Sequence, residues 1–244
     1  MAVNQNIAAL VDNRTKLRRL LGPGRHLCQL CEAELGNPGE YLCQACKSDL
    51  PINLYACPVC ALPGAFGLPC ASCIRSMRPY SRILACYKYE YPVNRMIQAL
   101  KYHSHLDKAR FLGQQMAVRF SGITEKPGCL IPVPLHHDRL AVRGFNQAHE
   151  IANSISTVIN IPVLYEYIRR TVATRAQTEL NAKQRRQNVR GVFKLVRSFA
   201  PGTHHVAIID DVVTTGATVT ELAQLLRGNG IKRVDIWAGA RAIL

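Results

Sequence analysis

The sequence has no uninterrupted apolar run close to the roughly 20 residues that a membrane-spanning helix needs. Its start, MAVNQNIAALVDNRTKLRRLL, also lacks the order of basic segment, apolar segment and small-residue cleavage site that marks a secretory leader. We therefore expect a cytoplasmic protein without membrane insertion. Residues 4–21 carry apolar side chains at helical spacing, which favours an amphipathic helix docked on the body of the protein over one lying on a membrane.

Acidic residues are scarce as well: 16 Asp and Glu accompany 31 Lys and Arg, and the formal net charge is +15 at pH 7. An excess of this size is typical of proteins whose partners are polyanions, such as nucleic acids, phosphates or pyrophosphate. The excess is greatest in residues 169–197, where nine basic residues accompany the single acid Glu179. Charge alone does not choose among these partners.

Cysteine, by contrast, is abundant and clustered, because eight of the ten cysteines form four C-x-x-C pairs before residue 74. Two such pairs close a tetrahedral zinc site, and four cysteine ligands leave no open coordination position, so the spacing predicts structural zinc. Disulfides and a redox pair are the weaker alternatives. Pairing in sequence order, interleaved pairing and a single occupied site all remain open. Pairing in sequence order gives Cys28, Cys31, Cys43 and Cys46 as one ligand set and Cys57, Cys60, Cys70 and Cys73 as the other.

From about residue 78, apolar segments alternate between helical and strand periods. The predicted helices are PVNRMIQALKYH, LDKARFLGQQMAVRF, FNQAHEIANSISTVI and TVTELAQLLRGNG, the last with a glycine cap, and the predicted strands are CLIPVP, VAIID and RVDIWAGA. Their short connections predict an α/β fold with a mostly parallel sheet and flanking helices. We expect a helical leader at 1–25, a small double zinc-ribbon domain at 26–77 and the α/β domain at 78–244.

The strand VAIID ends in two adjacent acids, Asp210 and Asp211. Neighbouring carboxylates repel each other, so the pair predicts a partner that uses both, at the strand end where α/β sheets bind ligands. The following turn, TTGATV, leads into a helix and predicts a phosphate cradle. A sugar phosphate with vicinal hydroxyls meets both demands, whereas the alternative is two acids that merely cap a turn. Neither a G-x-x-x-x-G-K-[ST] loop nor a G-x-G-x-x-G after a strand is present, which excludes those nucleotide-binding motifs.

All thirteen positions from Val206 to Thr218 match the phosphoribosyl pyrophosphate (PRPP) motif of type I phosphoribosyltransferases, which the segment resembles. Together with IPVPLHHDRLAVRGFNQA, LKYH and the cysteine pairs, the chain from about residue 26 resembles the ComF/GntX family, which is linked to competence and DNA uptake. The resemblance implies a type I phosphoribosyltransferase-like (Rossmann-like) fold preceded by zinc ribbons. It implies that the two acids hold the ribose hydroxyls and that the threonine turn holds the 5′-phosphate.

In the resembling family the loop PLHHDRLAVRGFN lies where pyrophosphate binds, and the basic stretch from Arg169 resembles a mobile loop that closes over PRPP. Surface charge or a nucleic-acid surface is the alternative reading of these arginines, and His136 and His137 are expected to be exposed rather than metal ligands. The implied catalytic residues are Asp210, Asp211, Arg139 and Arg143. The implied PRPP contacts are Thr214, Thr215, Gly216, Ala217, Thr218, Gly144, Lys101 and Arg185, with Gln177, Lys183 and Arg190 as further candidates.

Three functions fit these patterns. The first is a phosphoribosyltransferase that binds PRPP with magnesium and transfers to an unidentified acceptor. The second is a non-catalytic protein that handles single-stranded DNA and keeps the sugar-phosphate site for binding or sensing. The third, a docking scaffold with a degenerate site, is disfavoured because both acids and Gly216 are present. Competence proteins and a second copy of the chain are the other expected partners.

Overall fold

The computed structural model describes residues 27–37, 40–172 and 189–243 and divides the chain into two compact units, Met1–Asp49 and Leu50–Leu244. Each unit is described by itself below. The expected leader at 1–25 and the candidate residues Gln177, Lys183 and Arg185 lie outside the described residues.

The first unit is built around its cysteines. Leu27 and Glu34 form an antiparallel bridge that folds the first C-x-x-C pair into a turn, in which the N–H of Cys28 donates to the carbonyl of Ala33 over 2.8 Å. The short helix α2 (Gln44–Ser48) carries the second pair, and Cys43 is its N-cap. Leu42 and Cys28 are the buried apolar side chains among its described residues, which is a small core for a unit of this kind.

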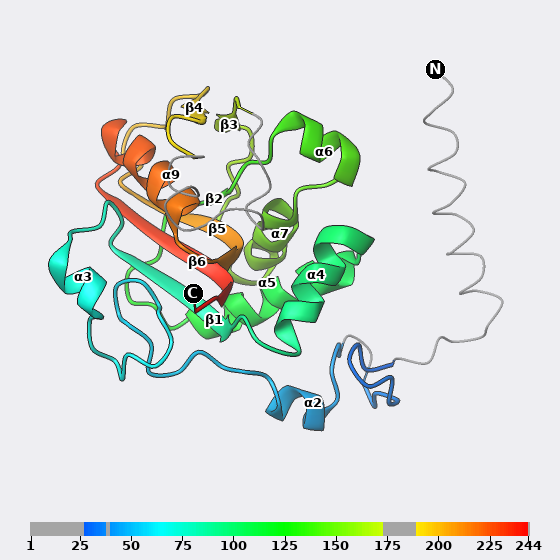
Figure 1. Ribbon diagram of the computed structural model, residues 1–244. Helices are drawn as coiled ribbons and strands as arrows, with labels where there is room; N and C mark the ends of the chain where they lie inside the picture. Colours follow the sequence, from blue (N-terminus) through cyan, green and yellow to red (C-terminus); the bar gives the residue numbers. More distant parts are fainter. Residues whose placement is uncertain (1–26, 38–39, 173–188, 244) are drawn as a thin grey trace, which may run out of the picture. The chain divides into compact units, whose positions relative to one another are not determined.

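The second unit contains a four-stranded parallel sheet in the order β1–β6–β5–β2 (Figure 1). Its strands are β1 (Arg82–Lys88), β2 (Cys129–Pro132), β5 (His205–Val213) and β6 (Arg233–Arg241). The central strands β5 and β6 are apolar and almost wholly buried, as parallel strands covered on both faces require. The expected fold class, a mostly parallel sheet with flanking helices that follows cysteine clusters, is therefore confirmed.

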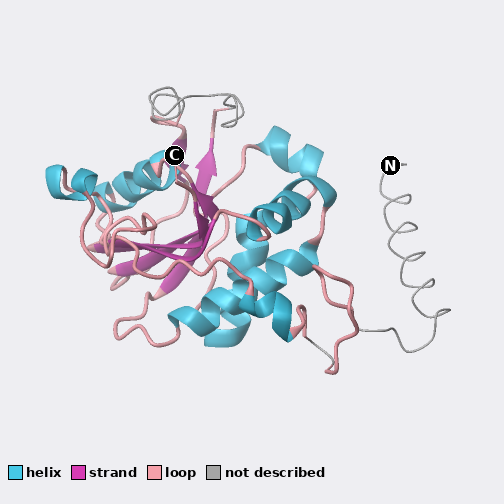
Figure 2. Cartoon of the chain, turned by 60° about the horizontal axis from the view of Figure 1, so that its bottom comes forward, coloured by secondary structure: helices cyan, strands magenta, loops and turns pink. Residues whose placement is uncertain are grey.

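Helices cover both faces of this sheet (Figures 1 and 2). Helix α9 (Ala217–Gly228) packs on one face, and α5 (Leu106–Phe120) and α7 (Gln147–Ile159) pack on the other, with α4 (Val93–His103) against α5. These four helices and the strands β2, β5 and β6 lie where the sequence periodicity places them. Asn229 is the C-cap residue of α9, and Gly230 after it, with φ +89°, is the glycine cap that the sequence predicts. Gly230 N donates to the Arg227 carbonyl and Ile231 N to the Leu226 carbonyl, each over 3.2 Å, which is the Schellman pattern.

Six of the described elements were not foreseen, and β1 and α2, given above, are two of them. Most of the expected loop after β2 is a helix, α6 (His137–Arg143), which His136 caps at its N-terminus and Gly144 ends in the left-handed conformation. The strands β3 (Ile168–Arg170) and β4 (Phe193–Leu195) form an antiparallel pair. The helix α3 (Ala71–Arg75) follows Cys70.

The second cysteine group belongs to the core of the sheet unit. Cys57, Cys60 and Ala61 are buried in the same apolar cluster as Val213 and Val219, which flank the turn after β5. The N–H of Ile83 on β1 donates to the carbonyl of Val59 over 2.8 Å. The expectation that residues 26–77 and 78–244 are separate domains stays a prediction.

Gly113 permits the close contact of α5 and α7, because a Cβ there would lie 2.4 Å from the Cβ of Ser154 and 2.8 Å from the carbonyl oxygen of Ile151. We expect Gly113→Ala to lower the free energy of unfolding by about 1–3 kcal/mol, despite the better helix propensity of alanine. Urea denaturation measures this effect. Gly228→Ala is the control, since nothing lies within 4 Å of a Cβ there; equal stability of the two variants would contradict the close-contact explanation.

Candidate functional site

The two acids lie on β5, three and two residues before its last residue, Val213. Asp211 is buried, whereas Asp210 keeps partial contact with solvent. Each carboxylate accepts a hydrogen bond from the next backbone N–H: Asp211 N donates to Asp210 Oδ1 over 2.9 Å and Val212 N to Asp211 Oδ1 over 2.8 Å. These bonds hold both side chains close to the strand and leave the second oxygen of each carboxylate for other partners.

Lys101 on α4 is one of those partners, because its Nζ lies 2.8 Å from Asp211 Oδ2. Burial opposes the charge of this lysine, but the Asp211 carboxylate outweighs it and the pKa of Lys101 stays above its usual value. The pKa of Asp210 is also raised, well above the usual range, by burial and by repulsion from Asp211. The lysine that the sequence reading placed near the ligand is thus paired with the acids themselves.

A neighbouring glycine makes room for the acid pair. Gly239 on β6 lies beside Asp211 on β5, and a Cβ at this glycine would approach the carbonyl oxygen of Asp211 to 2.9 Å. The sequence reading missed this residue because nothing in WAGAR tells a spacing role from an ordinary strand glycine.

The threonine turn connects β5 to α9 and has the features of an anion site. Gly216 is the N-cap of α9 with φ +77°, a conformation that glycine adopts most easily, although a Cβ there would have space. The hydroxyl of Thr215 accepts from Ala217 N over 3.2 Å. No acidic side chain occupies the first turn of α9, so its positive end is available for a phosphate.

The expected pyrophosphate segment is helix α6, and its residues have distinct positions. Arg143 Nη1 donates to Gln147 Oε1 over 2.6 Å, and Gly144 is the helix C-cap with φ +79°. His136 is buried and close to Asp138, with Nδ1 to Oδ2 3.3 Å apart, whereas His137 is exposed. The expectation that both histidines are exposed is therefore wrong for His136, which caps the N-terminus of α6 and is buried. The His136–His137–Asp138 group could hold a metal ion.

Arg170 on β3 is a site residue that the sequence reading did not single out from its basic stretch. It is buried, and its guanidinium lies 5.7 Å from the centre of the Phe193 ring. Burial lowers the pKa of Arg170 to about 10, the charge of Arg139 adds to this effect, and Asp210 opposes it. The three charged groups therefore lie within electrostatic range of one another. Arg190, the other described candidate of the stretch, is exposed.

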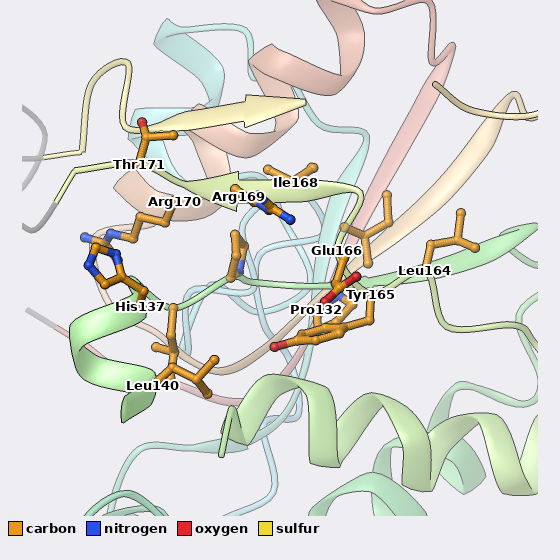
Figure 3. Close-up of a pocket in the computed structure, with 13 residues that line it drawn as sticks. Pro132, His137, Leu140, Leu164, Tyr165, Glu166, Ile168, Arg169, Arg170 and Thr171 are labelled. Carbon is orange, nitrogen blue, oxygen red and sulfur yellow. The ribbon is translucent and has the colours of Figure 1, made fainter. Parts of the chain in front are cut away.

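A cavity of about 430 Å³ has Arg170 among its lining residues (Figure 3). Pro132 at the end of β2, His137 and Leu140 on α6, and Tyr165 and Arg170 from the segment around β3 are among its lining residues. Most of the lining residues are apolar, and Arg169, Arg170 and Glu166 add charged groups, which is a usual composition for a small-molecule site. The acid pair is not part of the lining, but Pro132 pairs with Ile209, the residue before Asp210.

Both cysteine groups have the geometry of a tetrahedral thiolate site. Within each group the four sulfur atoms lie within 4.8 Å of one another. Cys31 Sγ and Cys43 Sγ are 3.7 Å apart, and Cys60 Sγ and Cys70 Sγ are 3.6 Å apart. Four sulfurs at about 2.3 Å from a zinc ion lie about 3.8 Å from each other, so both groups could hold zinc. All ten cysteines are free, and the groups follow sequence order.

Backbone N–H groups prepare one thiolate in each cysteine group. Burial raises the pKa of Cys28, but hydrogen bonds from the backbone of Cys31 and Cys43 outweigh it and lower the pKa to about 6. Cys57 follows the same pattern, with a pKa of about 7. Such N–H to sulfur bonds are the usual support of metal-bound cysteine.

The parallel sheet, the paired acids on β5 and the threonine turn before α9 define an α/β protein of the type I phosphoribosyltransferase-like class. In the described part of the chain no helix is both long and apolar enough to cross a membrane.

Comparison with known proteins narrows this class to a family. The chain is 34% identical over 224 residues to DNA utilization protein YhgH of Escherichia coli O157:H7, covering 89% of this chain and 97% of that protein. It is 34% identical over 179 residues to competence protein F of Haemophilus influenzae, covering 71% and 78% of the two chains. Competence protein ComFC of Bacillus subtilis is 25% identical over 221 residues, with 86% and 82% covered. The chain therefore belongs to the family of these DNA utilization and competence proteins, as its resemblance to ComF/GntX predicts.

Other comparisons add less. No protein-family model matches the chain. A solved structure described as an analysis of an invariant aspartic acid in HPRTs, glutamic acid mutant, is 17% identical, with a TM-score of 0.32 over 55% of this chain and 65% of that chain. A TM-score of this size is too low to argue from.

The raised pKa of Asp210 predicts that this acid lowers the stability of the fold. The folded state holds the proton more tightly than the unfolded chain, so stability falls as the pH rises from the ordinary carboxyl pKa of about 4 to the raised value. We expect Asp210→Asn to raise the Tm at neutral pH by about 2–4 °C, the shift for about 1 kcal/mol. Thermal unfolding at several pH values measures the difference in Tm between Asp210→Asn and wild type, which we expect to shrink toward pH 4. Asp107→Asn removes an exposed acid as the control, and a Tm for Asp210→Asn below that of wild type at neutral pH would contradict the argument.

The two cysteine groups predict two zinc ions per chain. Cys46→Ser and Cys73→Ser each remove one ligand from a different group, so each variant is expected to retain one ion. Cys129→Ala changes a buried cysteine outside both groups and retains two. Metal analysis of purified protein gives the count, and one ion in wild type would refute two separate sites.

Proposed function

We propose that this protein binds PRPP, or a closely related ribose 5-phosphate, at the acid pair and the threonine turn, and that it serves in the handling of DNA taken up by the cell. The observation that carries the proposal is the continuity of these parts: one strand and the turn after it contain two adjacent carboxylates and a helix N-terminus with no acid in its first turn.

The ribose part of the proposal rests on the hydrogen-bonding capacity of the acids. Each carboxylate uses one oxygen for a backbone N–H, and the 2′ and 3′ hydroxyls of ribose would donate to the remaining acceptor sites. The ammonium of Lys101 keeps one negative charge at Asp211 stable beside its neighbour. A neutral diol relieves this crowding better than a second anion would. The 5′-phosphate would then bind at the turn Thr214–Thr218, where backbone N–H groups can donate hydrogen bonds to an anion.

The arginines support the pyrophosphate part. Arg170 is buried and lies within electrostatic range of both Arg139 and Asp210, and the donors of guanidinium groups suit pyrophosphate oxygens. Arg143 is on the same helix as Arg139, α6, but its guanidinium donates a hydrogen bond to Gln147. Carboxylate oxygens are ligands that magnesium accepts, so Asp210 fits as outer support for an ion bound mainly by PRPP oxygens. When bound, magnesium would stabilise the negative charge of the departing pyrophosphate.

Transfer from PRPP would break the bond between ribose C1 and pyrophosphate, a step that needs charge stabilisation and exclusion of water more than a protein nucleophile. In this proposal Arg139 and Arg170 hold the leaving group, while the two acids and the turn fix the ribose. The cavity in Figure 3 adjoins these groups and is the place for an acceptor.

Two observations favour the DNA role. Relatives at about 34% identity are named for DNA utilization and for competence, and the net charge of +15 suits a polyanion. Single-stranded DNA is the proposed second ligand, and it needs no catalysis. This role is separable from PRPP binding, because backbone phosphates are attracted by the overall positive charge rather than by the acid pair.

Titration of PRPP into zinc-loaded protein, with and without magnesium, tests the ligand. We expect micromolar, magnesium-dependent binding by wild type and none by Asp210→Asn/Asp211→Asn, because the double variant loses both charges that hold the ribose hydroxyls. Asp49→Asn/Asp107→Asn removes two acids outside the site and is expected to bind like wild type. Normal PRPP binding by the first double variant would overturn the site assignment.

Single-stranded DNA affinity, measured by fluorescence anisotropy between 50 and 200 mM salt, tests the second role. Steep weakening with salt is expected because cations neutralising several phosphates release counterions. Asp210→Asn/Asp211→Asn is expected to bind DNA at least as well as wild type, since it loses two negative charges. Absence of salt-dependent DNA binding by wild type would remove this role and leave the PRPP proposal intact.

A further inference from the structure

Arg241, the last residue of β6, joins three backbone segments through its guanidinium. Its Nε donates to the carbonyl of Cys60 over 3.0 Å. Its Nη1 donates to the carbonyls of Val213, over 3.0 Å, of Thr214, and of Ala242, over 2.6 Å. The side chain is 8% exposed. A buried guanidinium is costly unless its donors are satisfied, and here all of these acceptors are backbone carbonyls.

On one side, Arg241 contacts the second cysteine group. Cys60 supplies its carbonyl to Arg241 and its sulfur to the thiolate cluster, 3.6 Å from Cys70 Sγ. Further bonds hold the same loop, because Asn53 Nδ2 donates to the carbonyl of Ala61 over 2.9 Å. The position of the Cys60 carbonyl is therefore tied to whatever holds the four sulfurs together.

On the other side, Arg241 contacts the start of the proposed phosphate turn. Val213 and Thr214 are the two residues before Thr215 and Gly216, and Ala242 N adds a bond to the Val213 carbonyl over 3.0 Å. The register of the sheet brings Arg241 to the start of the turn, because Val213 on β5 pairs with Arg241 on β6. Any displacement of the guanidinium would move the backbone from which the turn begins.

We propose that Arg241 is a positioning residue that couples metal binding at Cys57, Cys60, Cys70 and Cys73 to ligand binding at the turn Thr214–Thr218. Zinc at this second group fixes Cys60, Cys60 and Arg241 fix the Val213 and Thr214 carbonyls, and the turn then holds the ligand phosphate. The inference rests on the proposed PRPP function. Coupling is reciprocal, so PRPP must also strengthen zinc retention at this group. The first cysteine group belongs to the other compact unit and provides the matched control.

Ligand affinity is the first readout. We expect Cys73→Ser and Arg241→Gln each to weaken PRPP binding about tenfold, a usual size for coupling between sites, and Cys46→Ser to leave it unchanged. Combining Cys73→Ser with Arg241→Gln is expected to weaken binding little beyond either single change, because both interrupt one connection. Full additivity of the two effects, or wild-type affinity in Arg241→Gln, would overturn the coupling.

Zinc release to a chelator is the second readout and separates coupling from general destabilisation. In the Cys46→Ser background only the second group holds zinc, and saturating PRPP is expected to slow its release. Adding Arg241→Gln is expected to abolish this PRPP effect while the bound zinc remains one ion per chain. A PRPP effect of the same size with Gln at position 241 would refute the role of Arg241.

Amide hydrogen exchange is the third readout and needs no ligand. Removal of zinc from the Cys46→Ser protein, and Arg241→Gln with zinc present, are both expected to raise exchange in residues 214–219 while the core of α7 stays protected. If wild type binds no PRPP, the proposed function fails, but this exchange pattern still supports the connection. Unchanged exchange in residues 214–219 would overturn the connection whatever the ligand.

Discussion

The parallel pairing of β5 between β2 and β6 is the constraint on which the candidate site depends. Its register sets Ile209 beside Pro132 and Val213 beside Arg241. The first pairing brings the acids next to the segment that continues into α6, and the second brings Arg241 to the turn. A shift by one residue would turn Asp211 and its neighbours to the opposite face.

The site concentrates charges that a core would normally exclude. Asp211 is buried against Lys101, Asp210 is crowded by Asp211, and Arg170 is buried near Arg139. Replacing such groups by neutral ones often stabilises a protein, so their presence indicates a use other than stability. A ligand with hydroxyl donors and phosphate acceptors would relieve both the acidic and the basic crowding, which supports the proposal of a sugar phosphate.

The two cysteine groups have the same ligands but different surroundings. Among the described residues of Met1–Asp49 few apolar side chains are buried, so bound metal would supply much of the folding free energy of that part. Cys57 and Cys60 instead share the core of the sheet unit and, through Arg241, a connection to the turn. Two similar C-x-x-C patterns thus lie in different surroundings, one in a small unit and one in the core of the sheet unit.

The sequence by itself determined the parallel α/β class, the four main helices and the four C-x-x-C pairs, because periodicity and C-x-x-C spacing are local signals. The structure decided how the pairs group into two sets. It also singled out Asp210, Asp211 and the turn, which are contiguous. Helix α6 was missed since PLHHDRLAVRGFN contains few apolar residues at helical spacing. Only the tertiary structure decided that Lys101 pairs with Asp211 and that Arg170 lies within electrostatic range of Arg139. It also decided that Gly239 leaves space for the Asp211 carbonyl and that Arg241 joins Cys60 to Thr214. These contacts join residues far apart in the chain, and strand register and helix packing, rather than any local pattern, bring them together.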